Sequence, residues 1–72
     1  MIKITYYEEV IDNWGRTESS SNPDSIAAVL RNDSEWSDDM HFEDANGRVY
    51  FIDDLIGQTV LLSNGQTISI NE

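Results

Sequence analysis

The only histidine of the chain, His41, lies in the segment DMHFE, with Asp39 two residues before it and Glu43 two residues after it. An imidazole held between carboxylates is an arrangement suited to a general base. The rest of the catalytic inventory is thin, because there is no cysteine and no glycine pattern typical of a nucleophile elbow or a phosphate loop. We therefore interpret His41 as a solvent-facing strand residue and do not expect an enzyme.

The same region is rich in oxygen ligands, which are the ligands that calcium prefers. The stretch DSEWSDDMHFED, residues 33–44, is the natural place for a calcium loop. It has Asp38 where such a loop needs glycine at its sixth position, and Asp44 where the twelfth position should be glutamate. We expect neither a designed metal site nor a cofactor.

Net charge excludes another class of function. The chain has 14 Asp and Glu against 4 Lys and Arg, a formal net charge of −10. Such a protein repels nucleic acids and anionic membranes and attracts basic proteins. The four cations, which are too scattered to form a basic track, are Lys3, Arg16, Arg31 and Arg48. We expect no direct binding to nucleic acid or membrane.

The acidic residues are unevenly distributed, since residues 33–54 hold eight of the 14 and only Arg48 opposes them. The alternation in this region predicts a strand with Met40 and Phe42 inward and Asp39 and Glu43 outward. Outward side chains two residues apart on a strand are about 6.6 Å apart. This spacing is similar to that of successive phosphates, which advance about 3.4 Å per base pair along one strand's axis and lie farther apart along the backbone. An acidic sheet rim would then fit a groove built for nucleic acid.

In small size and strong acidity the chain resembles DNA-mimic inhibitors of the type that mobile elements use against host defence or transcription. Charge and spacing predict a binding module that blocks the basic surface of a nucleic-acid-handling protein, with carboxylates paired to its cations and Trp36 or Tyr50 supplying apolar contact. The predicted partner-binding residues are Asp33, Glu35, Trp36, Asp38, Asp39, Glu43, Asp44, Tyr50, Asp53 and Asp54.

Two alternatives remain open. One is a structural or assembly component that adds an edge strand to a larger sheet. The other is that acidity serves only solubility and blocks unwanted sheet pairing. Trp14, Trp36, Tyr7 and Tyr50 favour an interface, because partly exposed aromatic residues among charges are typical of binding anchors.

Length predicts one acidic domain over residues 1–72, because half of such a chain is too short for a core of its own. A homodimer is compatible with this size but not required by it. The amino terminus lacks the apolar run of a signal peptide, and LIGQTVLL is too short to span a membrane. We expect a soluble, cytoplasmic protein.

The elements that must position these residues follow from periodicity. Residues 2–11 alternate as a strand, with Ile2, Ile4 and Tyr6 on one face; DNWG predicts a turn, and RTESS a return strand. SSNPDSIAAVLRND predicts one helix, capped at Ser21 or Asn22 and ended at residues 32–33. Asn46-Gly47 and Asn64-Gly65 each predict a hairpin with a type I′ turn, and DDLIG a bend or helical turn between them. The order ββαββββ predicts an α+β fold with one helix packed on an antiparallel sheet.

Overall fold

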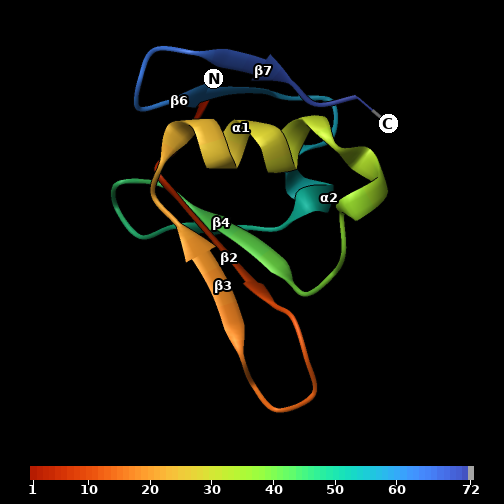
Figure 1. The fold of residues 1–72 in the computed structure, drawn as a ribbon. Coiled ribbons are helices and arrows are strands. Elements are labelled where there is room, and N and C mark those ends of the chain that lie inside the picture. Colours follow the sequence, from red (N-terminus) through yellow and green to blue (C-terminus); the bar gives the residue numbers. More distant parts are fainter. Residues whose placement is uncertain (72) are drawn as a thin grey trace.

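The strands of the computed structural model, which describes residues 1–71, form two small sheets around one helix (Figure 1). The fold is α+β, and its order confirms the sequence prediction in outline. The strands are β1 (Ile2–Ile4), β2 (Tyr6–Val10), β3 (Thr17–Ser20), β4 (Met40–Glu43), β5 (Val49–Tyr50), β6 (Thr59–Leu62) and β7 (Thr67–Ser69). The helices are α1 (Pro23–Arg31), the single 3-10 turn η1 (Asp33–Glu35) and α2 (Ile52–Leu55).

The sheets have the strand orders β3-β2-β4-β5 and β1-β6-β7. Every pairing is antiparallel except that of β1 with β6, which is parallel and sets Ile2 opposite Val60 and Ile4 opposite Leu62. The expectation of one wholly antiparallel sheet was therefore incomplete. Alternation along a strand reports which face is buried, but it does not report the partner strand or its direction.

The first predicted strand divides at Thr5, whose N–H donates to the Glu43 carbonyl at 2.9 Å. Ile4 is buried before this point and Tyr7 is buried after it, while Tyr6 is half-buried. The buried face therefore changes from even to odd positions where the chain leaves one sheet for the other. Our placement of Tyr6 on the buried face was wrong for this reason.

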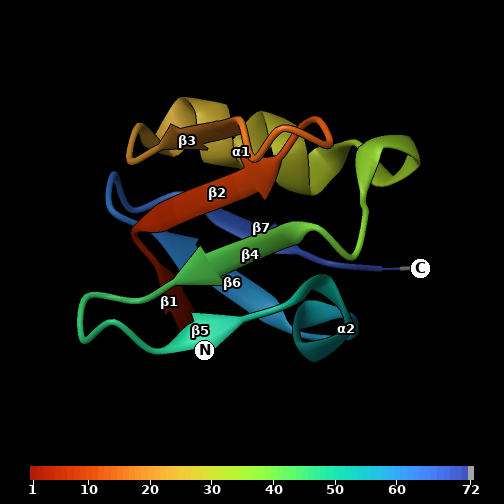
Figure 2. The ribbon, with the colours of Figure 1, turned by 90° about the horizontal axis from the view of Figure 1, so that it is seen from below.

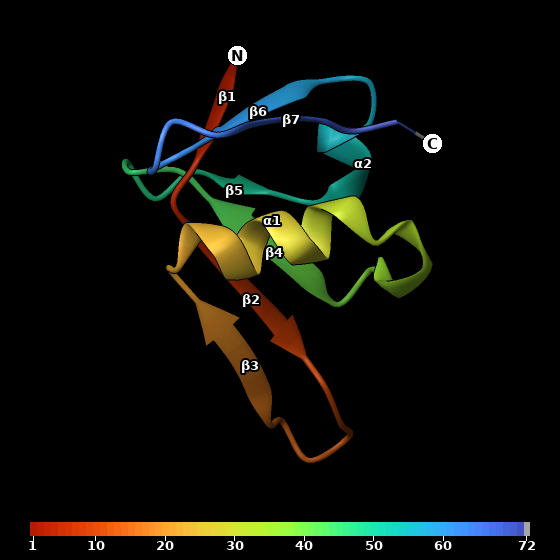
Figure 3. The same ribbon diagram turned by 45° about the horizontal axis from the view of Figure 1, so that its top comes forward.

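Helix α1 forms where its capping residues predict. The Asn22 side chain accepts from the backbone N–H of Asp24 at 2.9 Å, Pro23 starts the helix, and Asn32 follows its last residue. Ile26, Ala27 and Leu30 are buried on the face that meets the sheets. Figures 1 and 3 show α1 between β7 and the four-stranded sheet.

The core joins residues of both sheets and both helices. Its largest fully buried members include Phe42, Ile26 and Leu55. The Tyr7 and Phe42 rings pack with their centroids 5.6 Å apart. Helix α2 occupies the predicted bend at DDLIG and buries Leu55 beneath β4. The charged outer positions of β4 are thus carried by a strand whose other side is fixed in the core.

The two predicted hairpins form, but without type I′ turns. Among residues 1–71 positive φ occurs only at glycine, so Gly47 and Gly65 are left-handed while Asn46 and Asn64 are not. In the first turn the Asp44 carboxylate accepts from the backbone N–H groups of Asn46 at 2.8 Å and Arg48 at 3.0 Å. A side-chain acceptor at the start of the turn favours a turn in which only its last residue is left-handed.

Candidate functional site

His41 lies on the outer face of β4, as its alternation with Met40 and Phe42 predicts. Its Nε2 is 3.1 Å from a carboxylate oxygen of Glu43, and its backbone pairs with Glu8 of β2. The imidazole and the Glu43 carboxyl are both partly covered, with side-chain exposures of 24% and 29%. Neither of the two surface hollows described below is lined by His41.

Five of the predicted carboxylates are exposed and have no hydrogen-bond or ion-pair partner among residues 1–71. We call them the acidic end. They are Asp33, Glu35, Asp38, Asp39 and Asp53. Because none of them is paired within this part of the chain, the group is available to cations on another molecule.

The elements that carry the acidic end lie at one end of the molecule. Asp33 and Glu35 belong to η1, Asp38 and Asp39 stand just before β4, and Asp53 is on α2. Figures 1 and 2 show η1, the start of β4 and α2 on the same side of the fold. Residues that are 20 positions apart in the chain are brought to a common end in this way.

The other predicted carboxylates are engaged within the chain. Glu43 pairs with His41, and Asp44 caps the β4–β5 turn. Asp54 accepts from the backbone N–H of Phe51 at 3.0 Å and so closes the start of α2. Glu43 and Asp44 also lie at the far end of β4, away from η1 and α2 (Figure 2). The predicted residues therefore do not form one continuous ridge.

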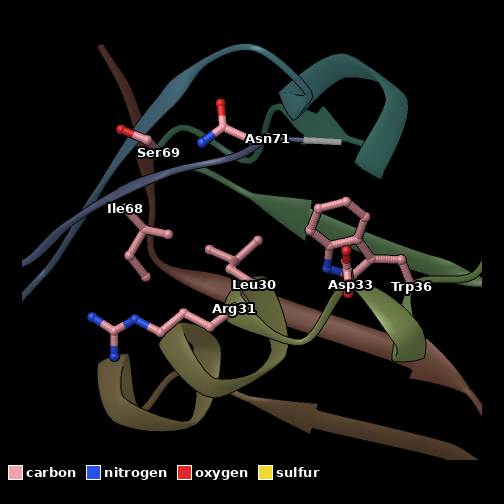
Figure 4. Close-up of a pocket in the computed structure, with 7 residues that line it drawn as sticks. All are labelled: Leu30, Arg31, Asp33, Trp36, Ile68, Ser69 and Asn71. Carbon is pink, nitrogen blue, oxygen red and sulfur yellow. The ribbon is translucent and has the colours of Figure 1, made fainter.

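Trp36 is half-buried and fixed, because its indole N–H donates to the Val29 carbonyl at 3.1 Å. Its ring packs against the core and also lines a hollow of about 270 Å³. Figure 4 shows this hollow, with Asp33 beside Trp36 and the Arg31 guanidinium pointing away from both. Sequence reasoning placed Trp36 among the binding residues, and the fold sets it beside a free carboxylate.

Tyr50 points towards the core side of β5, opposite Phe42, and is half-buried. The Arg48 guanidinium carbon lies 5.2 Å from the centroid of its ring. Together with Asp54, both residues line a second hollow of about 400 Å³. Tyr50 therefore shares a hollow with one predicted carboxylate, Asp54, which already accepts a hydrogen bond at the start of α2.

The cations of the chain do not neutralise the acidic end. Arg16 pairs with Asp12 at 3.2 Å, Arg48 lies over Tyr50, and Arg31 faces the side-chain amide of Gln66. Lys3 lies on β1 and is exposed. Within residues 1–71, Arg16–Asp12 is the one pair of a Lys or Arg with a carboxylate closer than 4.0 Å.

Tyr7 is a buried tyrosine with several glutamates near it. It is buried, and its hydroxyl donates to Glu9 at 2.7 Å. Burial, this hydrogen bond and the nearby charges of Glu9, Glu18 and Glu35 all raise the pKa of Tyr7 above its ordinary value of 10.0. Tyr7 is thus a core residue, and our expectation that it is partly exposed was wrong.

Sequence reasoning named Trp14 as partly exposed but left it out of the site, and it is the most exposed large apolar side chain in the described chain, at 92%. It lies in the β2–β3 turn. The sequence did contain a signal for a structured turn at Trp14, because residues 12–16 and 44–48 share the pattern Asp-x-x-Gly-Arg. In both copies the aspartate accepts from the backbone N–H groups two and four residues later.

No group of three His, Asp or Glu side chains in residues 1–71 is placed to hold a metal ion. The helices in this part of the chain are all too short or too polar to cross a membrane. Comparisons with protein-family models, curated proteins and solved structures give no significant match. The function has to be argued from the surface itself.

Proposed function

We propose that the chain is a cytoplasmic, non-catalytic binding module whose acidic end occupies a basic surface on a nucleic-acid-handling protein and blocks it. The observation that carries the proposal is the set of five exposed carboxylates without partners at one end of the fold. The net charge of −10 adds long-range attraction to a basic partner and repels nucleic acid itself. This is how a DNA-mimic inhibitor acts, and antagonists made by mobile elements are the expected setting.

The mechanism is competition for cations. Carboxylates of the acidic end pair with arginines and lysines that otherwise hold phosphates, through charge-assisted hydrogen bonds. Trp36 borders the same end and offers the edge of a fixed indole beside Asp33. A rigid aromatic surface adjoining charges supplies the apolar contact that charge pairs alone lack.

The position of His41 supports a non-catalytic role. It lies on an open sheet face, and neither hollow that we describe includes it. A general base needs a bound substrate within hydrogen-bond reach and a site that excludes water. The His41–Glu43 pair instead fits the outer surface of a sheet, where the imidazole hydrogen-bonds a single carboxylate of its own strand.

A second candidate is assembly through strand addition. β3 is an edge strand that pairs only with β2, so one side of its backbone is open to another strand. Under this alternative the acidity serves solubility alone. The two candidates differ in their response to salt, because pairing through exposed charges is screened while backbone pairing is not.

The test is affinity capture with the tagged chain at low and at moderate salt, followed by identification of the bound proteins and their purification. We expect a basic partner with a nucleic-acid function, held tightly at low salt and lost as ionic strength rises. The matched variant is Asp38→Asn with Asp39→Asn, which removes two charges and keeps the shape of the side chains. A partner without nucleic-acid function, or binding indifferent to both salt and this variant, contradicts the proposal.

A further inference from the structure

The β2–β3 hairpin extends away from α1 and from the other sheet, as Figures 1 and 3 show. Its far end carries three exposed apolar side chains: Val10 at 43%, Ile11 at 42% and Trp14 at 92%. None of the three is part of the core, so the fold does not account for an indole at this position. Fully exposed indoles are uncommon, whereas Trp is among the residues most enriched at binding hot spots.

The turn that presents Trp14 is held in one shape by Asp12. One carboxylate oxygen accepts from the backbone N–H of Trp14 at 2.9 Å and of Arg16 at 3.1 Å, and the other lies 3.2 Å from the Arg16 guanidinium. Gly15 takes the left-handed conformation that the turn requires, with φ of 78°. An anchor on a preorganised turn loses less conformational entropy on binding than one on a mobile loop.

The negative charge around the hairpin indicates what kind of partner surface can bind Trp14. Glu8, Glu9 and Glu18 flank the hairpin on its two strands, Asp12 is paired with Arg16, and the chain carries −10 overall. A second copy of the chain would bring two strongly negative molecules together, which charge repulsion opposes. The complementary surface is therefore an apolar pocket with lysines or arginines around its rim.

We propose that the β2–β3 hairpin tip is a docking element in which Trp14 inserts into an apolar, cation-rimmed pocket on a partner protein. The inference extends the proposed function, since it gives the same basic partner a second, apolar contact. It rests on different residues from the acidic end, so the two are separable by experiment.

The first step places a photo-activatable phenylalanine analogue at position 14 of the full chain in cells, and at position 49 as the control. Val49 is a fair control because it is exposed to 46% but lies on β5, outside the hairpin. We expect a partner protein cross-linked from position 14 and not from position 49. Cross-linking of the chain to itself, the same products from both positions, or no product at position 14 overturns the proposal.

The second step uses the cross-linked protein, expressed and purified, as the binding probe. Trp14→Ala should raise its Kd about tenfold or more, as loss of a buried aromatic anchor does, and Trp14→Phe should raise it less. Val49→Ala should leave Kd unchanged. Because Trp14 is 92% exposed, Trp14→Ala should melt at the same temperature as the parent chain, so a loss of binding is not a loss of folding. An unchanged Kd, or a net-acidic partner, overturns the proposal.

The same probe separates this inference from the proposed function. If Trp14→Ala weakens binding while Asp38→Asn with Asp39→Asn and added salt do not, the anchor stands and the blocking of a basic surface fails. The reverse result removes the anchor and leaves the proposed function in place.

Discussion

The carboxylate of Asp12 accepts a hydrogen bond of 2.9 Å from the backbone N–H of Trp14, and so fixes the turn that carries the most exposed large apolar side chain of the described residues. The same oxygen accepts from Arg16. A turn organised around one side chain depends on that side chain more than on the strands that flank it.

Asp12→Ala should therefore loosen the hairpin tip without unfolding the protein. We expect faster hydrogen exchange at the Trp14 and Arg16 amides. The change in unfolding free energy should stay below about 1 kcal/mol, since Arg16 is largely exposed and solvent screens the ion pair that is lost. Amide exchange followed by NMR is the measurement. Asp44→Ala is the matched control, because it removes the equivalent cap of the β4–β5 turn. It should leave the Trp14 amide unchanged, and equal exchange at Trp14 in parent and Asp12→Ala would contradict this account.

The unpaired carboxylates of the acidic end should make the isolated protein sensitive to salt. Moderate sodium chloride should raise its melting temperature, because screening reduces repulsion among charges that have no cation nearby. The double change of Asp38→Asn and Asp39→Asn should reduce the rise. A melting temperature that is unchanged or lowered by salt would mean that the charges are already compensated.

The raised pKa of Tyr7 predicts that the protein loses stability at alkaline pH. Its folded pKa is raised above the unfolded value of 10.0, first by burial and then by Glu9 and neighbouring charges. Above pH roughly 10 the unfolded state releases the tyrosine proton more readily than the folded state, so the free energy of unfolding falls as pH rises from there. The stabilisation is fully present below that pH. Thermal melts between pH 8 and 11 should show a steeper decline for the parent chain than for Tyr7→Phe. Identical slopes would exclude Tyr7 as the cause.

The backbone of the β6–β7 turn should favour glycine at position 65. Gly65 has φ of 87° and open space around its Cα, so alanine there meets no neighbour but must adopt a left-handed backbone. Gly65→Ala should cost about 1–2 kcal/mol of unfolding free energy in a denaturant titration. Ser63→Ala, an exposed change in the same turn, should cost far less. A cost equal to that of Ser63→Ala would show that the backbone adapts.

Local signals in the sequence were sufficient to predict most of the helices and strands. Pro23 after a capping asparagine, the Asn-Gly pairs and the alternation of residues 40–43 each depend on neighbours within a few positions, and each predicted element forms there. The parallel pairing of β1 with β6 could not be predicted, because it joins residues almost 60 positions apart. The change of buried face at Thr5 follows from that pairing.

The candidate site could be predicted only in part, for the same reason. Alternation placed Glu43 and His41 on the outer face of β4, but it could not show that they pair with each other. The gathering of η1 and α2 at one end depends on how α1 and the sheets pack, which no short pattern records. A role for Asp12 in its turn could be predicted from the sequence, because Asp-x-x-Gly-Arg occurs twice. That Asp12 fixes the backbone of Trp14 could be seen only in the structure of the turn.

The central claim is that the acidic end and nucleic acid compete for one surface of a partner, and direct competition tests it. The partner captured at low salt is purified, bound to the chain, and titrated with a short DNA duplex while release of the chain is followed. We expect the duplex to displace the chain, with less duplex needed to displace the Asp38→Asn, Asp39→Asn variant than the parent. A ternary complex, or a chain that stays bound in a large excess of duplex that itself binds the partner, would contradict the account.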